Sequence, residues 1–525
     1  MMLSNMSASI TQPIHPSAQL TRTLARLSSN RDFESVTARL LTQGGDTRIA
    51  LNLQGLNTYG FGPRPDPGLV QFGSSTGSVI STGGFRAAVA LFRRLYGPLG
   101  SYHQEVERQR RELSQLSGAA DLPGTELVFA ASGTDIHLFA AHLASQGKGG
   151  RFRAAMVEPS ETGSGVPAAL AALHFASQTS QGSSVQRGAP ISPSALSSPK
   201  SVKLRHADGS LRSTPEVDAE FSAQVADLIQ TDGRCLLVLT DVTKTGLLAP
   251  SLACAAALRA QYGKRLSVLV DACQFRASAG TLRAYLAQEF MVAITGSKFV
   301  GGPAFCGALL LPPGLAQRGR EVALNALVDY SARSDWPADW QSARVLQESA
   351  NLGQLLRWEA ALVELHRFKA IAEKDTHDFL NAWQRAVSTR LAQDDTFEAL
   401  PVMPLSRGTN SAHTAWDEVQ TILGFRVFKP IAGGGRQVLS LEETTQLYQQ
   451  LRGAHGAPGA TAARFQLGQP VLCGQQDGRP VGALRLCSGA RLVTESLARH
   501  QPVTCAIEQA MRALDQIELL AQALR

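Results

Sequence analysis

Three short stretches place reactive side chains at the ends of apolar runs. "AITGSKF" carries Lys298, "LVDACQF" carries Asp271, and "FAASGTD" carries Ser132, Gly133 and Thr134. An unpaired charge is costly away from water, so a lysine and an aspartate at the ends of buried strands need partners. Hydroxyls and backbone N–H groups just before a helix suit a phosphate. Together, the three stretches predict a phosphate cradle, an aspartate and a lysine in one site.

Pyridoxal phosphate requires these three features in this order. The lysine forms a Schiff base with the cofactor aldehyde, which removes the cost of burying its ammonium. The aspartate pairs with the pyridine nitrogen and keeps it protonated, so that the ring accepts electrons. The sequence therefore predicts pyridoxal 5'-phosphate as the cofactor, with Lys298 and Asp271 as the catalytic residues.

A fourth strand end, "LTDVTKTG", carries Asp241, Thr243 and Lys244. This turn either lines the site, with Thr243 as a substrate contact, or is a plain turn at a strand end. The sequence leaves both readings open.

The elements that must position these residues are strands and helices in alternation. Between residues 125 and 311, apolar runs of strand length alternate with helix-like segments, and ligands bind at the carboxyl ends of such strands. The expected strands are "TELVFAAS", "RAAMVEPS", "CLLVLTDV", "LSVLVDAC", "MVAITGS" and "GALLLPP". Because their apolar runs are continuous, a mostly parallel sheet covered on both faces is predicted.

The rest of the chain is expected to form a second, smaller α+β domain. Residues 343–392 have a helical period and would connect the domains, "TILGFRVF", "ARFQLGQPVLCG" and "GALRLCSGARLV" look like strands, and 494–524 looks like a closing helix. We therefore divide the chain into an N-terminal arm (1–60), a large α/β domain (61–342) and a linking helix with the small domain (343–525).

Composition excludes several classes of protein. The net charge of +7 is spread along the chain, which argues against a nucleic-acid partner. No apolar run reaches the roughly 18 residues of a membrane helix, and the start lacks a secretory signal. Seven irregularly spaced cysteines favour reduced thiols in a cytoplasmic protein, and the scattered histidines indicate no metal site.

The motif pair "VDACQ" and "TGSKFVGGP", with 27 residues from Asp271 to Lys298, resembles the fold-type I pyridoxal-phosphate enzymes. It is most similar to the class V aminotransferase and cysteine desulfurase superfamily, which includes kynureninase-like lyases. The lysine motif is also similar to that of selenocysteine synthase. The resemblance implies a doubly wound, mostly parallel seven-stranded sheet domain with a smaller α+β C-terminal domain. It also implies a homodimer with active sites at the interface.

The resemblance assigns further roles by position. Gln274 would bond the ring 3-oxygen or the Schiff base, and Arg485, in "ALRLCSG", would grip the substrate α-carboxylate as a bidentate fork. The phosphate would be held by Gly133 and Thr134 together with Thr295 and Ser297.

Two regions depart from the pattern or leave alternatives open. The family usually stacks an aromatic ring, often a histidine, on the cofactor, but residues 157–167 contain neither. Stacking would come from elsewhere, either His137 or a small polar group, although His137 could simply pack on its helix. The Gly- and Pro-rich stretch 57–81 is expected either to close over the substrate mouth or to pack on a dimer partner.

The expected activity is that of an aminotransferase-like or lyase-like enzyme acting on an amino acid at Cα or Cβ. A cysteine desulfurase, or a kynureninase-like lyase, is the alternative, because Cys473 lies in a loop-like stretch 12 residues before Arg485. Cys473 could instead be a small residue at a strand end. A non-catalytic cofactor-binding or regulatory protein is the third possibility, which the presence of both Asp271 and Lys298 disfavours.

Overall fold

The computed structural model describes residues 30–96, 101–146, 152–192, 196–408, 415–431, 433–453 and 463–524. The first 29 residues of the expected N-terminal arm lie outside the described residues. In the described part of the chain, no helix is both long enough and apolar enough to cross a membrane. The same residues contain no group of three histidine, cysteine, aspartate or glutamate side chains that could hold a metal ion.

The larger sheet follows the predicted α/β pattern, and its main path has the order β2-β9-β8-β7-β5-β3-β4. Along this path all strands run parallel except β9, which is antiparallel to both of its neighbours; off the path, β6 pairs antiparallel with β5. The six predicted strands are present, and the sequence missed only the short β4 and β6. The strands are β2 (Glu126–Ala130), β3 (Arg153–Val157), β4 (Lys200–Val202), β5 (Cys235–Asp241), β6 (Leu248–Ala249), β7 (Leu266–Ala272), β8 (Met291–Thr295) and β9 (Gly307–Leu311).

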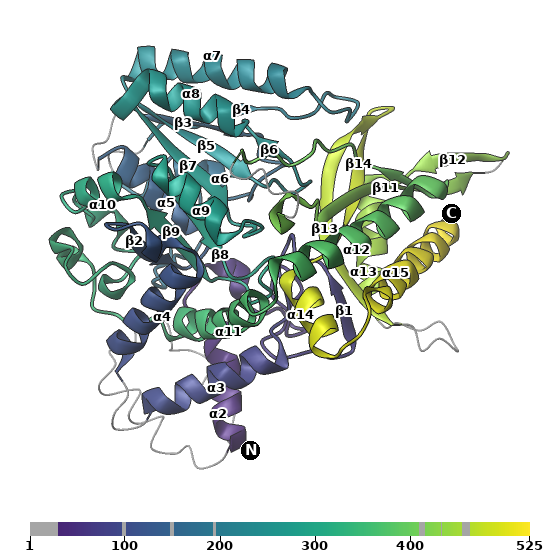
Figure 1. Ribbon diagram of the computed structural model, residues 1–525, viewed down its shortest axis with the longest axis horizontal. Helices are drawn as coiled ribbons and strands as arrows, with labels where there is room; N and C mark the ends of the chain where they lie inside the picture. The colour runs from purple at the N-terminus through teal and green to yellow at the C-terminus, as the bar shows by residue number, and fades with distance from the viewer. Residues whose placement is uncertain are drawn as a thin grey trace.

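Helices cover both faces of this sheet, as continuous apolar strands require. Along β5, Leu237 and Leu239 face one core and Leu236 and Val238 face the other. The first core includes α7 (Thr214–Asp232), α8 (Leu252–Tyr262) and α9 (Ala279–Ala287), and the second includes α5 (Gly133–Ala144), α6 (Val166–Leu170) and α10 (Pro313–Gly319). Figure 1 shows α7 and α8 together along the upper edge of this domain.

A second sheet, of order β1-β13-β14-β11-β10 with β12 paired to β11, forms the C-terminal domain at the right of Figure 1. Its strands are β1 (Leu69–Phe72), β10 (Phe397–Ala399), β11 (Ile422–Ile431), β12 (Gly435–Val438), β13 (Arg464–Gln476) and β14 (Arg479–Cys487). β1 pairs in parallel with β13, with Leu69 opposite Arg464. Residues 69–72 therefore join the C-terminal sheet, although they fall in the range that the sequence assigned to the large domain.

Helices connect and frame the two sheets. The helical stretch 343–392 is a pair, α11 (Leu352–Lys369) and α12 (Glu373–Gln393), and α3 (Thr82–Tyr96) packs on α11 (Figure 1). The expected strand at 490–493 is wrong, because α14 (Ala490–Ala498) begins there. The closing helix is interrupted at Pro502, where α15 (Val503–Ala523) begins. The remaining helices are α2 (Asn30–Leu40), α4 (Tyr102–Leu116) and α13 (Leu441–Arg452).

Candidate active site

The candidate active site is a cavity of about 220 Å³ at the carboxyl ends of the large sheet's strands. All but one of the predicted site residues line it, from the ends of the three strands β2, β7 and β8 and from β14. They are Ser132, Gly133, Thr134, Asp271, Gln274, Thr295, Ser297, Lys298 and Arg485. Thr243, the exception, is not among the described residues that line this cavity. The fold thus brings together residues that are up to 353 positions apart in the sequence.

The N-terminus of α5 forms one wall of the cavity. Ser132 has an extended backbone and caps the helix, and its Oγ accepts hydrogen bonds from the N–H groups of Thr134 and Asp135. A Cβ on Gly133 would lie 3.0 Å from the Cys273 Sγ atom, so a larger residue would crowd the strand end at β7. The positive end of the α5 dipole and the side chain of Thr134 therefore lie at the cavity, which suits an anion.

Thr295 and Ser297 also line the cavity, and their hydroxyl groups make different hydrogen bonds. The Thr295 Oγ1 donates to the Cys273 carbonyl at 2.6 Å, and the Ser297 Oγ donates to the Thr295 Oγ1 at 3.2 Å. The proton of Thr295 is therefore committed to the backbone, whereas Ser297 can turn toward a ligand. Thr295 positions the serine and has no second proton to offer.

An arginine that the sequence analysis missed lies at the same cradle. The Arg48 Nη1 donates to the Thr134 Oγ1 at 3.2 Å, and its Nη2 donates to the Ser132 Oγ at 3.4 Å. Asp46 holds the guanidinium by hydrogen bonds from Nε at 2.9 Å and from Nη2 at 2.6 Å. Arg48 comes from a single 3-10 turn, Thr47–Ile49, with no motif around it. It adds a fixed positive charge to the phosphate cradle.

Asp135 gives this cradle a group that titrates near neutral pH. Burial, followed by the nearby charge of Asp46, raises the pKa of Asp135 to about 7. Its Oδ2 accepts a 2.5 Å hydrogen bond from the Ser132 Oγ. Below this pH the carboxyl is neutral and does not oppose an anion at the helix N-terminus.

Asp271 is held as a carboxylate at the end of β7. Its Oδ1 accepts from the Cys273 N–H at 3.2 Å, and its Oδ2 lies 3.3 Å from both the Thr162 Oγ1, which donates to it, and the His137 Nε2. Burial alone would raise the pKa of Asp271, but His137 and Lys298 outweigh burial and hold it well below its usual range. The aspartate is therefore ionised across the physiological range.

His137 contacts the carboxylate of Asp271. Its ring is 1 % exposed, and its Nδ1 lies 2.7 Å from the Gly133 carbonyl oxygen while its Nε2 faces Asp271. From the sequence, His137 was expected either to stack on the cofactor ring or to pack on its own helix. The structure places it in contact with the catalytic aspartate, a role that neither reading included. The aromatic rings that line the cavity are instead Tyr59 and Phe305, besides the His137 imidazole.

Gln274 and Lys298 both contact the stretch 57–81 beside the cavity. The Gln274 Nε2 donates to the Ser75 carbonyl at 3.1 Å, while its Oε1 is buried without a hydrogen-bond partner. The Lys298 carbonyl accepts a weak 3.5 Å bond from the Ser78 Oγ. The stretch 57–81 thus lines the cavity through Tyr59, Ser75 and Thr76, in agreement with its expected place at the mouth.

Arg485 on β14 reaches the cavity with most of its donors already used. Its Nε and Nη2 donate to the Gln469 carbonyl at 3.2 and 2.5 Å, its Nη2 also donates to the Thr76 Oγ1 at 3.2 Å, and its Nη1 donates to the Lys244 carbonyl at 3.1 Å. A guanidinium has five N–H donors, so one on Nη1 remains. The expected bidentate fork is therefore not available in this arrangement, because Nη2 is occupied.

In the turn after β5, Asp241 and Thr243 bond other parts of the protein, and Lys244 lines the cavity. The Thr243 Oγ1 accepts from the Leu247 N–H at 3.1 Å within the turn, and Thr243 is not among the described residues lining the cavity, so its expected substrate contact is not supported. Asp241 is fully buried against Arg407, whose Nε donates to it at 2.8 Å, and against the Tyr285 hydroxyl at 2.8 Å. Lys244 does line the cavity, and burial, with smaller effects of Arg485 and Lys298, lowers its pKa to about 8.

Cys473 does not lie in a loop. It is within β13, is 3 % exposed and packs between strands, with its Sγ directed at the Val481 carbonyl at 3.6 Å. Burial raises the pKa of this thiol, and it is not among the described residues lining the cavity. The expected loop context is wrong because the apolar alternation of residues 464–473 continues the strand through the cysteine.

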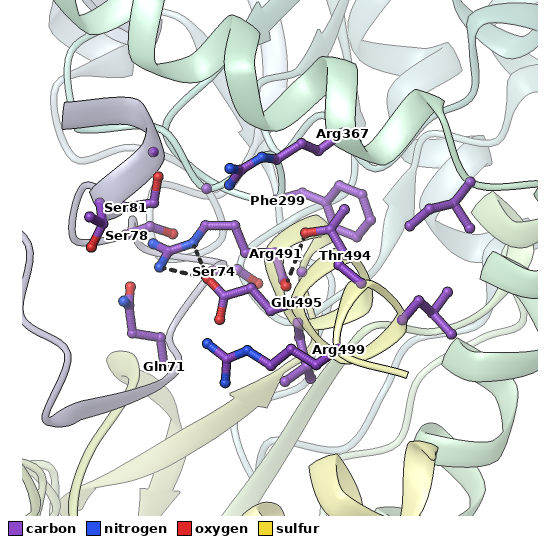
Figure 2. A pocket seen from close by; sticks show the side chains of 18 of the residues that line it. Gln71, Ser74, Ser78, Ser81, Phe299, Arg367, Arg491, Thr494, Glu495 and Arg499 are labelled. Atoms are coloured by element: carbon purple, nitrogen blue, oxygen red, sulfur yellow. Dashed lines mark hydrogen bonds and ion pairs between the residues drawn. The ribbon is translucent and has the colours of Figure 1, made fainter. Parts of the chain in front are cut away.

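A second, larger cavity of about 1230 Å³ holds none of the predicted site residues. Figure 2 shows Arg367 and Arg491 among its side chains, with Arg491 bonded to Glu495. The two cavities share no lining residue, although neighbours in sequence line them, Phe299 the larger one and Lys298 the smaller one. We assign the active site to the smaller cavity, since only that cavity combines a lysine, a buried aspartate and an anion cradle.

Comparison with known proteins supports the fold. No known family and no curated protein matches the sequence. Among solved structures, mouse CSAD matches with a TM-score of 0.51 at 14% identity, covering 86% of this chain and 84% of that one. Oryza sativa TDC with PLP and tryptamine (TM-score 0.48, 14% identity, 87% and 84% covered) and the Escherichia coli cysteine desulfurase CsdA (0.47, 17%, 85% and 95%) are also similar. The chain therefore has the fold that its sequence predicts, that of the fold-type I pyridoxal-phosphate enzymes.

Proposed function

We propose that this protein is a pyridoxal-phosphate-dependent enzyme that acts on an amino acid. The observation that carries the proposal is the ionised, buried Asp271 in the same cavity as Lys298 and the α5 cradle. A buried aspartate with a lowered pKa needs a cationic partner when the cavity is filled. A protonated pyridine nitrogen is such a partner, and a phosphate and an aldehyde on the same ring would match the cradle and the lysine.

The residues present fit this cofactor in three independent ways. The Gln274 Oε1 is a buried acceptor without a partner, as expected of a group that waits for a ligand. Gly133 keeps the cradle open where a Cβ would meet Cys273. Arg48, the Thr134 hydroxyl and the positive end of the α5 dipole supply the donors and the charge that a phosphate requires.

When bound, the cofactor supplies an electron-accepting ring that stabilises negative charge at the substrate Cα. Asp271 keeps the ring nitrogen protonated, and His137 and Thr162 keep Asp271 ionised and correctly oriented. Lys298 bonds the cofactor aldehyde and, as a free amine, takes or returns a proton at the substrate Cα. Arg485 binds the α-carboxylate through its remaining Nη1 donor.

Among reactions, we favour aminotransferase-like or lyase-like chemistry of the class V type over desulfuration. A desulfurase needs a mobile thiolate at the cofactor. Cys473 is buried in β13, and burial raises the pKa of both Cys273 and Cys306, the cysteines that do line the cavity. Transfer of a proton at Cα requires only Lys298, which has no competing task.

We further propose a homodimer with active sites at the subunit interface, in the cytoplasm. All seven cysteines are free, which suits a reducing compartment. Light scattering coupled to size-exclusion chromatography would measure the mass. A monomer that keeps full activity would contradict the dimer.

The test of the cofactor assignment is reductive trapping. The protein, purified with pyridoxal phosphate, should absorb visible light, and borohydride should leave the cofactor attached to the peptide that contains Lys298. Lys244, the other lysine lining the cavity, is the matched control: Lys244→Gln should still be labelled, and Lys298→Ala should not. Label on Lys244, or no label on the wild type, would refute the assignment.

A further inference from the structure

Lys244 is an ammonium without a partner in the candidate active site. Its backbone is fixed, since its N–H donates to the Glu161 carbonyl at 2.9 Å and its carbonyl accepts from the Arg485 Nη1 at 3.1 Å. Its side chain lines the cavity, yet among the described residues its Nζ makes no hydrogen bond and no ion pair. The backbone of Lys244 is therefore fixed, and its ammonium group lies at the cavity.

Glu161, the acidic residue that contacts this turn through its backbone, is already engaged. The Glu161 Oε1 accepts from the Thr245 Oγ1 at 2.7 Å, and its Oε2 accepts from the Thr245 N–H at 3.1 Å. The Arg205 Nε lies 3.8 Å from the same carboxylate, and both side chains are buried. Arg205 thus compensates the charge of Glu161, which leaves Lys244 to find its counter-ion in the ligand.

The charges in the cavity suggest what this counter-ion is. Lys298 and Arg48 belong to the cofactor in the proposed enzyme, one at the aldehyde and one at the phosphate cradle. That leaves Lys244 and Arg485 as two cations on the substrate side. One α-carboxylate compensates one of them, and Lys244, which is partly buried, would remain without a counter-ion at some cost in free energy.

We propose that Lys244 binds a second acidic group of the substrate, so that the enzyme's substrates are acidic amino acids. This inference rests on the proposed function and specifies its substrate class. Arg485 binds the α-carboxylate, and Lys244 binds a carboxylate, sulfinate or similar anionic group on the side chain. Neutral amino acids leave Lys244 without a counter-ion and bind more weakly.

The lowered pKa of Lys244 agrees with this role. At about 8, with burial as its main cause, the group is still mostly protonated at neutral pH in the empty site. An anion beside it would raise the pKa again and keep the charge in place. Selectivity for acidic substrates should therefore decline as the pH rises above about 8.

Ligand titrations of the cofactor-loaded protein test the substrate class. The change in cofactor absorbance gives dissociation constants for L-glutamate, L-aspartate and L-alanine. Lys244→Gln should raise the constants for the two acidic ligands by about tenfold or more and that for alanine by less than twofold. Lys264→Gln, an exposed lysine in the turn Gly263–Arg265 just before β7, is the control and should change none of them. An equal effect on glutamate and alanine would assign Lys244 to the α-carboxylate and overturn the inference.

A second measurement works without the cofactor. In the apo protein, acetic anhydride should acetylate Lys244, and peptide mapping should show that glutarate slows this reaction whereas butyrate does not. Protection by both or by neither would overturn the inference. Failure of the proposed function looks different, because the wild type would then not take up pyridoxal phosphate, whatever the result of acetylation.

Discussion

Replacing His137 by asparagine should move the acid limb of the activity profile toward higher pH. In the wild type the His137 Nε2 lies 3.3 Å from the Asp271 Oδ2, in a place where the histidine is 1 % exposed. Burial alone would raise the pKa of Asp271, and the histidine is the first of the groups that oppose this effect. Without it, the aspartate should take up a proton at a pH where it is otherwise ionised.

The size of the effect follows from the contact that is lost. An interaction with a charged partner contributes about 1.5–3 kcal/mol, which corresponds to a change of about one to two pH units in the titration of Asp271. Asp271 should then still be ionised at pH 8, so the loss of kcat there should stay below about tenfold. Because the pKa of Asp271 starts well below its usual range, the ring nitrogen would lose its carboxylate partner only in clearly acidic solution, and the loss should grow there.

The assay is kcat/KM between pH 3 and 9, together with the absorbance of the bound cofactor over the same range. His142→Asn is the matched control, because His142 lies on the same helix but contacts the Ala323 carbonyl, away from the cavity. An acid limb that stays in place in His137→Asn, with an unchanged cofactor spectrum, would refute the role of this histidine.

Three further variants test other parts of the structure. Asp135→Asn should be more stable than the wild type above pH 7, by about 1–4 kcal/mol in calorimetry, because the buried carboxyl resists ionisation there; the gain should disappear toward pH 4, and a gain independent of pH would contradict the raised pKa. Cys473→Ser should keep turnover with amino acids, and loss of sulfide release from cysteine with an intact cofactor spectrum would instead support a desulfurase. Arg407→Met should lower the unfolding free energy by about 3–5 kcal/mol in urea, since Asp241 then stays buried without its cation, and an unchanged midpoint would show that the pair contributes nothing.

The sequence predicted the strand ends well because they combine two strong local signals. A continuous apolar run followed by a polar residue and glycine marks the place where a buried strand meets a binding edge. Lys298 and Asp271 both stand at such places, and the structure puts them in one cavity. Arg48 and His137 lack such a signal, since one lies in a turn of three residues and the other inside an apolar helix.

The errors have a common physical origin. The predictions for Thr243 and Cys473 rest on their neighbours in sequence. The role of Thr243 depends instead on a bond across its turn, and that of Cys473 on a contact with the partner strand. Arg485 was placed correctly, yet its free donors could be counted only when Gln469, Thr76 and Lys244 were seen around it. Local sequence specifies which residues reach the cavity better than it specifies which of their atoms remain free.

The pairing of β1 with β13 has a consequence for how the protein is made. Leu69 lies opposite Arg464, so one of the first strands to leave the ribosome must wait for one of the last. Contacts between such distant parts of a chain form late and slow folding. The same segment carries Ser75 and Thr76 into the cavity, so the large sheet can assemble during synthesis while the cavity wall is still missing. A ribosome-bound chain that ends before residue 464 should therefore contain the cradle and Lys298 but not yet a closed site, and uptake of the cofactor should be a step that follows release.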